Sequence, residues 1–221
     1  MNRSTCAIVG CVIASLATLL PAGYADIVAS GDINIELNTA DHNPNNPVSL
    51  DFDGFAANPL QFYGILGPFI PSADIYVTGF SNSLLGITAN PAIDARLRVL
   101  QPGDSIEASL MWGQDHAILH GSYKAFFEDV DNYRGPFALG NVGYLAVQFQ
   151  SQANTTHFGW IRYEAVTATS SQAVGRITGW AYDSDPGQAI HAAAVPEPSG
   201  TLLMLAGSLL LVVRRHRRAA R

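Results

Sequence analysis

Cysteine is nearly absent from this chain. The sequence holds two cysteines, Cys6 and Cys11, and both lie near its N-terminus. The rest of the chain therefore contains no disulfide, no thiol nucleophile and no thiolate ligand for a metal ion. This excludes a disulfide-stapled scaffold and a cysteine enzyme for the body of the protein.

Basic residues are scarce in the middle of the chain. Between Asp26 and Ala194, six lysines and arginines stand against seventeen aspartates and glutamates, a formal net charge of −11. A segment this acidic is repelled by phosphate backbones, so nucleic acid is excluded as a partner. The same charge favours solubility and attracts cations.

Long helical patterns are missing between the two ends. Short β-rich runs appear instead, separated by clusters of Gly, Pro, Asn and Asp. Nine candidate strands cover Ile27 to Leu37, Val48 to Phe52, Asp74 to Phe80, Ala92 to Leu100, Ser105 to Trp112, Ala117 to Ser122, Tyr144 to Gln150, His157 to Thr167 and Arg176 to Tyr182. We therefore predict an all-β ectodomain over residues 26 to 194, a β-sandwich or jelly-roll-like fold.

The finer pattern adds three expectations. Apolar and polar residues alternate from Ile33 to Leu37 and from Leu145 to Gln150, which predicts one buried and one wet face for each strand. A short helix or turn is expected around residues 123 to 129. Residues 183 to 194 are expected to form the last turn and a linker.

Catalytic signatures are also missing. The chain has no HExxH zinc motif, no GxSxG elbow and no lysine-bearing glycine loop for phosphate, so we predict that it is not an enzyme. His116 and His120 share strand parity, but surface histidines are favoured over a metal-ligand pair. Asp129 and Asp131 alternate with other residues in an acidic run and are candidate calcium ligands, with solvated loop charge as the competing interpretation. No other cofactor is predicted.

Long apolar runs are confined to the two ends. At the N-terminus, Arg3 precedes an apolar stretch from Ala7 to Leu20, and small residues follow at Gly23 and Ala25. This order is typical of a secretory signal peptide over residues 1 to 25, with cleavage by signal peptidase after Ala25. An uncleaved membrane anchor is the alternative interpretation.

The C-terminal segment, residues 195 to 221, has three parts in order. Val195, Pro196, Glu197 and Pro198 come first; the prolines lack amide donors and hold the chain extended. Residues 201 to 213 are uncharged and apolar, as a transmembrane helix must be, although thirteen residues span only about 20 Å. An ordinary buried helix is the alternative, but that helix would carry a polar face.

A basic cluster follows the apolar stretch. It consists of Arg214, Arg215, Arg217 and Arg218. By the positive-inside rule these arginines stay in the cytoplasm, which leaves the preceding domain outside.

This ordered set resembles the PEP-CTERM sorting signal of exported bacterial proteins. The resemblance implies recognition by an exosortase, a membrane-embedded transpeptidase-like enzyme, with cleavage near the Pro-Glu-Pro. It further implies transient residence in the inner membrane of a Gram-negative bacterium and transfer to the cell surface or an exopolysaccharide matrix. The preceding runs YLAVQFQ, THFGWIRYEA and ITGWAYDSDPGQAI also resemble a block common in PEP-CTERM proteins, with Phe158 and Asp183 where Tyr and Glu are usual.

Two main functional hypotheses follow, with a hydrolase as a third. The first is an exosortase-sorted structural protein of the cell surface or extracellular matrix. The alternative is a carbohydrate-binding module or adhesin on a β-sandwich, with or without calcium. Trp160 and Trp180 bear on the choice, because they either pack across strands in the core or form a stacking platform for a sugar ring.

Overall fold

The computed structural model describes residues 27–67, 70–79, 83–86, 97–113, 117–125 and 129–195. These residues are all-β and contain fifteen strands and no helix, which confirms the predicted fold class at that level. The predicted signal peptide and the predicted transmembrane helix lie outside the described residues. All of the strand pairs are antiparallel.

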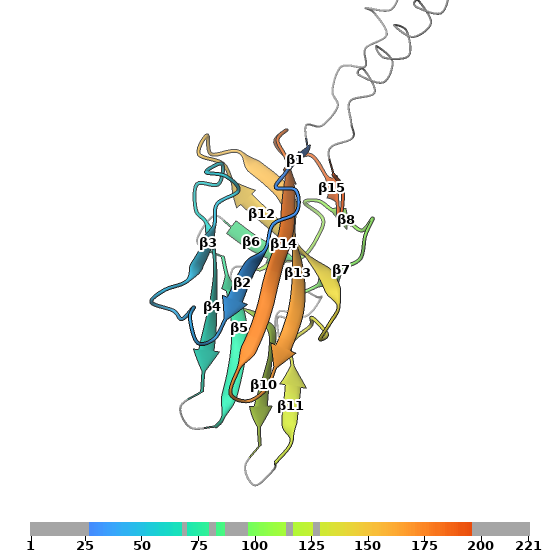
Figure 1. Ribbon diagram of the computed structural model, residues 1–221. Helices are drawn as coiled ribbons and strands as arrows, with labels where there is room; N and C mark the ends of the chain where they lie inside the picture. The colour runs from blue at the N-terminus through green and yellow to red at the C-terminus, as the bar shows by residue number, and fades with distance from the viewer. Residues whose placement is uncertain are drawn as a thin grey trace, which may run out of the picture.

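The strands form two main sheets and a short ribbon (Figure 1). The large sheet contains β1 (Ile27–Ala29), β2 (Ile35–Asn38), β6 (Ser83–Gly86), β7 (Val99–Leu100), β9 (Trp112–Gly113), β12 (Val142–Gln150), β13 (Thr156–Ala168) and β14 (Ala173–Asp183). The small sheet has the order β11-β10-β5-β4-β3, with bounds Asp131–Arg134, Ala117–Lys124, Ser72–Thr78, Leu60–Leu66 and Val48–Leu50. The ribbon pairs β8 (Ser105–Ile106) with β15 (Ile190–His191).

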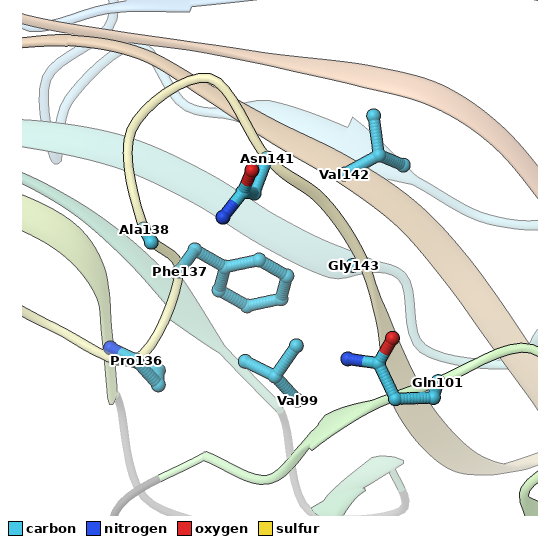
Figure 2. A pocket seen from close by; sticks show the side chains of 8 residues that line it. All are labelled: Val99, Gln101, Pro136, Phe137, Ala138, Asn141, Val142 and Gly143. Atoms are coloured by element: carbon cyan, nitrogen blue, oxygen red, sulfur yellow. The ribbon is translucent and has the colours of Figure 1, made fainter.

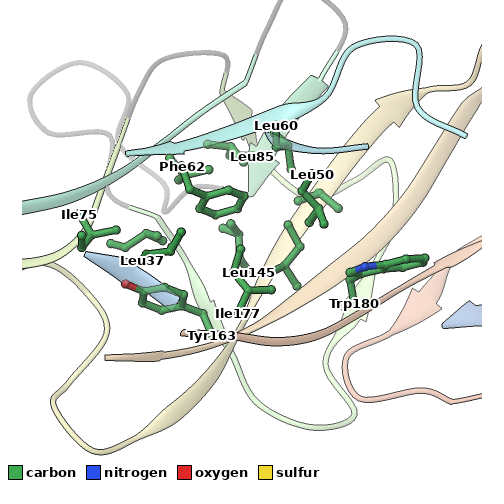
Figure 3. Close-up of a cluster of buried hydrophobic side chains, with 14 of the residues drawn as sticks. Leu37, Leu50, Leu60, Phe62, Ile75, Leu85, Leu145, Tyr163, Ile177 and Trp180 are labelled. Carbon is green, nitrogen blue, oxygen red and sulfur yellow. The ribbon is translucent and has the colours of Figure 1, made fainter. Parts of the chain in front are cut away.

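The main core lies between the two sheets, an arrangement consistent with the predicted β-sandwich. Phe62 and Ile75 point inward from the small sheet, and Leu145 and Ile177 point inward from the large sheet (Figure 3). The predicted alternation is confirmed here, because Leu145, Val147 and Phe149 are all buried in this core.

The large sheet is covered on its outer face as well, at one end. Eight buried residues form this second cluster, which we call the outer cluster: Leu100, Ile106, Ala146, Phe158, Trp160, Ala181, Ile190 and Ala192. The ribbon lies over this part of the sheet and contributes Ile106 and Ile190. The prediction of one wet face is therefore wrong for the end of the sheet that carries Ala146.

Several predicted boundaries need correction. The expected strand from Ile27 to Leu37 is split into β1 and β2, because Gly31 takes a left-handed φ of 68° between them. The whole of β4 was not predicted. Residues 183 to 194 are no linker, since β15 pairs with β8 and buries Ile190. Residues 123 and 124 belong to β10 and not to a helix, and residues 126–128 lie outside the described part.

Candidate functional site

The outward face of the small sheet carries partly exposed tyrosines. Along β5, Ile75 and Val77 point into the main core, so Asp74 and Tyr76 point to the opposite face. Along β4, Phe62 points inward and Tyr63 therefore points outward. We use the name tyrosine face for Tyr63, Tyr76 and Tyr123 together with Asp74 and Arg134.

Tyr63 and Tyr76 face each other across β4 and β5. They are direct partners in the strand register, and their rings stack with centroids 5.8 Å apart and planes 11° from parallel. Both side chains are partly exposed. Burial on the sheet raises the pKa of each phenol, so both remain neutral hydrogen-bonding groups at physiological pH.

An ion pair lies beside these rings. The Arg134 guanidinium donates from Nε to Asp74 Oδ1 at 2.5 Å, and its Nη2 donates to Asp74 Oδ2. The Asp74 side chain is 2% exposed, whereas the Arg134 side chain is 36% exposed. The hydrogen bond to Asp74 raises the pKa of Arg134, so the guanidinium stays charged and fixed in place.

Gly121 makes this ion pair possible. In the strand register it lies between Asp74 on β5 and Arg134 on β11. A Cβ atom at this position would stand 2.1 Å from Asp74 Oδ1 and 2.6 Å from the Ala73 carbonyl oxygen. The missing side chain therefore leaves a slot through which Asp74 reaches two strands across the sheet.

Tyr123 completes the group. It follows Gly121 by two positions on β10 and so shares its face. The Arg134 guanidinium carbon lies 5.4 Å from the centre of the Tyr123 ring, a cation–π contact. The tyrosine face thus combines planar rings with a hydrogen-bond donor group that is held in place, and these are groups suited to binding a ligand.

A shallow hollow lies elsewhere, between β7 and the loop that leads into β12 (Figure 2). Figure 2 shows the ring of Phe137 near Val99, with the amide groups of Gln101 and Asn141 on either side. Its volume is about 230 Å³, less than the roughly 300–1,000 Å³ of typical ligand pockets. Phe137 is only 2% exposed, so its ring offers little surface to a ligand.

The two calcium candidates have other partners. Asp129 lies 3.7 Å from the ammonium group of Lys124, and Asp131 Oδ1 accepts a hydrogen bond of 3.0 Å from the Ser170 amide. Hydrogen bonding by Ser170 lowers the pKa of Asp131. Within the described ranges, no three acidic, histidine or cysteine side chains gather into a group that could hold a metal ion.

His120 is buried, contrary to the expectation of a surface histidine. Its Nε2–H donates to the Thr167 carbonyl oxygen at 3.0 Å, so its Nδ1 accepts from the Tyr163 hydroxyl at 2.8 Å. Burial lowers the pKa of His120, which keeps the ring neutral. His116, the other member of the predicted pair, lies outside the described residues.

A second buried histidine belongs to a chain of side-chain hydrogen bonds. His157 Nδ1 donates to the Asp183 carbonyl oxygen at 2.9 Å, and its Nε2 accepts from the Thr155 hydroxyl at 2.8 Å. Thr155 Oγ1 in turn lies 2.7 Å from Ser151 Oγ. These hydrogen bonds stabilise the turn between β12 and β13. Because His157 is 1% exposed and Ser151 is 3% exposed, a substrate cannot reach either side chain.

The tryptophans occupy two different clusters. Trp180 lies in the main core and Trp160 in the outer cluster, because the register pairs Trp160 with Ala181 and Trp180 with Ile161. Both are buried, as expected, but on opposite faces of the large sheet, so the idea that they pack on each other is wrong. At 4% and 3% exposure, neither ring can serve as a sugar platform.

The predicted sorting signal is described only at its first residue. Val195 is 60% exposed at the end of the described chain. Pro196, Glu197, Pro198 and the arginine cluster lie outside the described residues. No helix long and apolar enough to cross a membrane occurs among the residues that the structure describes, and residues 201–213 are not among them.

Comparisons of the chain with protein-family models, with curated proteins and with solved structures found no match.

Proposed function

We propose that this chain is an exported surface protein, released from its signal peptide after Ala25 and delivered by its C-terminal segment to an exosortase. The folded part is then a β-sandwich ectodomain that ends at the cell surface or in the extracellular matrix of a Gram-negative bacterium. Its role there is structural, without catalysis. The sequence resemblance to PEP-CTERM proteins suggests the route, and the positions of Ile27 and Ala194 in the fold support it.

The observation that carries the proposal is how closely the fold fits between the two predicted processing points. The first strand begins at Ile27, two residues after Ala25, and Ala194, two residues before Pro196, still packs against buried residues of the fold. Both ends lie on the outer cluster, where Ile27 and Ala194 pack against its buried residues. Figure 1 shows β1 and β15 at the same end of the molecule.

This arrangement suits a tethered domain. With both ends together, removal of the leader and cleavage near the Pro-Glu-Pro would each cut chain just outside the packed cluster. The fold would stay intact through both steps. The excess of acidic residues between the ends keeps the released domain soluble.

Deleting residues 195 to 221 tests the proposal. We expect the truncated protein to appear in the medium, whereas the full-length chain is found in membrane and surface fractions. The variant Arg221→Ala, which alters the tail outside the four-arginine cluster, should distribute like the full-length chain and serves as the control. Unchanged membrane and surface fractions after the deletion would contradict the proposal.

Intact-mass measurement of the native protein gives a second readout. We expect the loss of residues 1 to 25 and of the tail beyond the Pro-Glu-Pro. A mass equal to that of the whole chain would show that neither end is processed.

The tyrosine face favours a second candidate function, a carbohydrate-binding module or adhesin. Stacked tyrosines and a fixed guanidinium on an outer sheet face are the groups that such a module needs. The acidic pair Asp129 and Asp131 is the place where calcium would act in a calcium-dependent form. Carbohydrate binding that persists when a chelator removes calcium would show that binding by the tyrosine face does not require calcium.

A further inference from the structure

The tyrosine face differs in charge from the rest of the domain. Its one carboxylate, Asp74, is paired with its one guanidinium, Arg134, so the face carries no net charge. On the outer face of the large sheet the ion pair is more open to solvent: Asp32, 2.6 Å from Arg162, has a side chain that is 92% exposed, whereas that of Asp74 is 2% exposed. A strongly acidic domain thus presents one uncharged surface with aromatic rings.

We infer that the tyrosine face binds an uncharged polysaccharide strand laid across β4, β5, β10 and β11. This inference deepens the second candidate function and rests on it. The register between the β-strands fixes where the groups lie across the sheet. Tyr63 is on β4, Tyr76 and Asp74 are on β5, Tyr123 is on β10 and Arg134 is on β11. The guanidinium of Arg134 lies beside both Asp74 and Tyr123.

Stacking supplies the first part of the recognition. A pyranose ring has an apolar C–H face that packs on an aromatic ring. Tyr63 and Tyr76 hold each other in parallel orientation and are only partly exposed, so little side-chain freedom is lost when a ligand binds.

The guanidinium supplies the second part. An arginine carries five N–H donors, and Asp74 takes two of them through Nε and Nη2. The other three N–H donors belong to a guanidinium whose position is fixed by Asp74 on one side and by Tyr123 on another. Sugar hydroxyls can accept hydrogen bonds from these donors at a low entropy cost, because the arginine side chain is already ordered before binding.

Charge and dimensions favour an uncharged polymer. An acidic polysaccharide would be repelled by the domain's net charge of −11, and Arg134 has no excess charge to offset this, because Asp74 neutralises it. Three strand spacings of about 4.8 Å separate β4 from β11, so the face extends about 14 Å, enough for a short oligosaccharide segment.

Affinity electrophoresis in native gels tests the inference. The probes are laminarin, dextran and galactomannan as uncharged polymers and alginate as an acidic one. The full-length chain is kept soluble in a polyoxyethylene detergent, which carries no sugar headgroup. We expect at least one uncharged polymer to retard the protein and alginate to leave its mobility unchanged.

Substitutions locate the binding site. The double variant Tyr63→Ala/Tyr76→Ala should weaken retardation by about tenfold or more, the loss typical of removing a central aromatic contact. Arg134→Ala should also weaken it, whereas Arg162→Ala, a matched charge removal on the other sheet, should not. Thermal unfolding of each variant shows whether it is folded, and Tyr63→Phe/Tyr76→Phe should restore retardation because it keeps both rings.

Three results would overturn the inference. The first is that no uncharged polymer retards the wild-type chain. The second is that a folded double-alanine variant binds as well as the wild type. The third is a concentration-dependent dimer lost in the same variant without polymer binding, which would show that a second copy covers the face. The cellular location of the chain, tested by the tail deletion, is independent of all three.

Discussion

The outer faces of the two sheets meet solvent in different ways. On the large sheet, the ribbon of β8 and β15 covers an apolar cluster, and charged pairs such as Arg162 with Asp32 occupy exposed positions. On the small sheet, partly exposed tyrosines surround one fixed ion pair. The first face stabilises the fold by burying apolar side chains. The second face leaves aromatic surface in contact with water, which is unfavourable for stability. This difference is why the small sheet is the better candidate for binding.

The largest expected effect is on the covered face. Trp160→Ala removes a ring that is 4% exposed and contacts Tyr144 at 5.3 Å between ring centres. We expect the free energy of unfolding to fall by about 3–5 kcal/mol, as for other buried aromatic truncations. Denaturant titration measures this.

Trp160→Phe is the matched control for that variant. The indole nitrogen of Trp160 has no hydrogen-bond partner among the described residues, so the phenylalanine variant loses no hydrogen bond there. What it loses is part of the buried ring volume. It should therefore be clearly more stable than the alanine variant. Equal losses for the two variants would contradict the role of the ring in packing.

The next effect tests the ion pair on the tyrosine face. Arg134→Ala leaves the Asp74 carboxylate buried without its partner, whereas Asp74→Ala leaves Arg134 able to turn into solvent. We expect a loss of about 2–3 kcal/mol for Arg134→Ala and about 1 kcal/mol for Asp74→Ala, below the usual 3–5 kcal/mol because water reaches the site once Arg134 is removed. Chemical denaturation of both variants gives the comparison. A larger loss for Asp74→Ala would show that the pair is not organised as described.

The sequence predicts the long strands of the large sheet better than the ribbon that covers them. The all-β class and the long strands β12, β13 and β14 were predicted within a few residues, because their inward positions follow a period of two. The sequence predicts a linker where β15 lies, because the two residues of this strand leave no period to detect and Ile190 is buried through a partner strand that is distant in the chain.

The missed strand β4 has a different cause. Leu60 and Phe62 point inward, but Tyr63 and Ile65 are apolar or aromatic on the outward side, so the run shows no alternation of polarity. The outward aromatic residue Tyr63 makes the tyrosine face a candidate site, and it also removes the alternation of polarity by which β4 could be predicted. Gly121 carried no sequence signal either, because its role depends on Asp74 and Arg134, which are distant in the chain.

A third prediction concerns the inner face of the small sheet. Burial lowers the pKa of His120 from its ordinary 6.5, partly opposed by hydrogen bonds to backbone carbonyls and by the charge of Asp74, while Tyr163 faces it as a neutral hydroxyl. The unfolded chain therefore binds a proton at higher pH than the folded one. Stability should be fully present above pH 6.5 and should decrease below it, by up to about 1.4 kcal/mol per pH unit.

The variant His120→Gln isolates this contribution. It has no titrating group at this position, so the difference in unfolding free energy between it and the wild type should shrink as the pH falls from 7 to 5.5. Urea titrations at a series of pH values measure the difference. A difference that does not change with pH would mean that His120 does not titrate in this range.

The smallest effect on stability is expected for the residues with the largest expected effect on binding. Tyr63→Ala removes one ring of the stacked pair, and cross-strand aromatic pairs on partly exposed faces contribute about 0.2–1 kcal/mol. The double-mutant cycle of Tyr63 and Tyr76 should therefore give a small coupling energy of about 0.5 kcal/mol in unfolding. A coupling above about 2 kcal/mol would place the pair with the buried aromatic rings of the main core and make it a structural feature. A small coupling together with a large loss of polymer retardation would separate the two outer faces by function, since the rings would then contribute to binding far more than to folding.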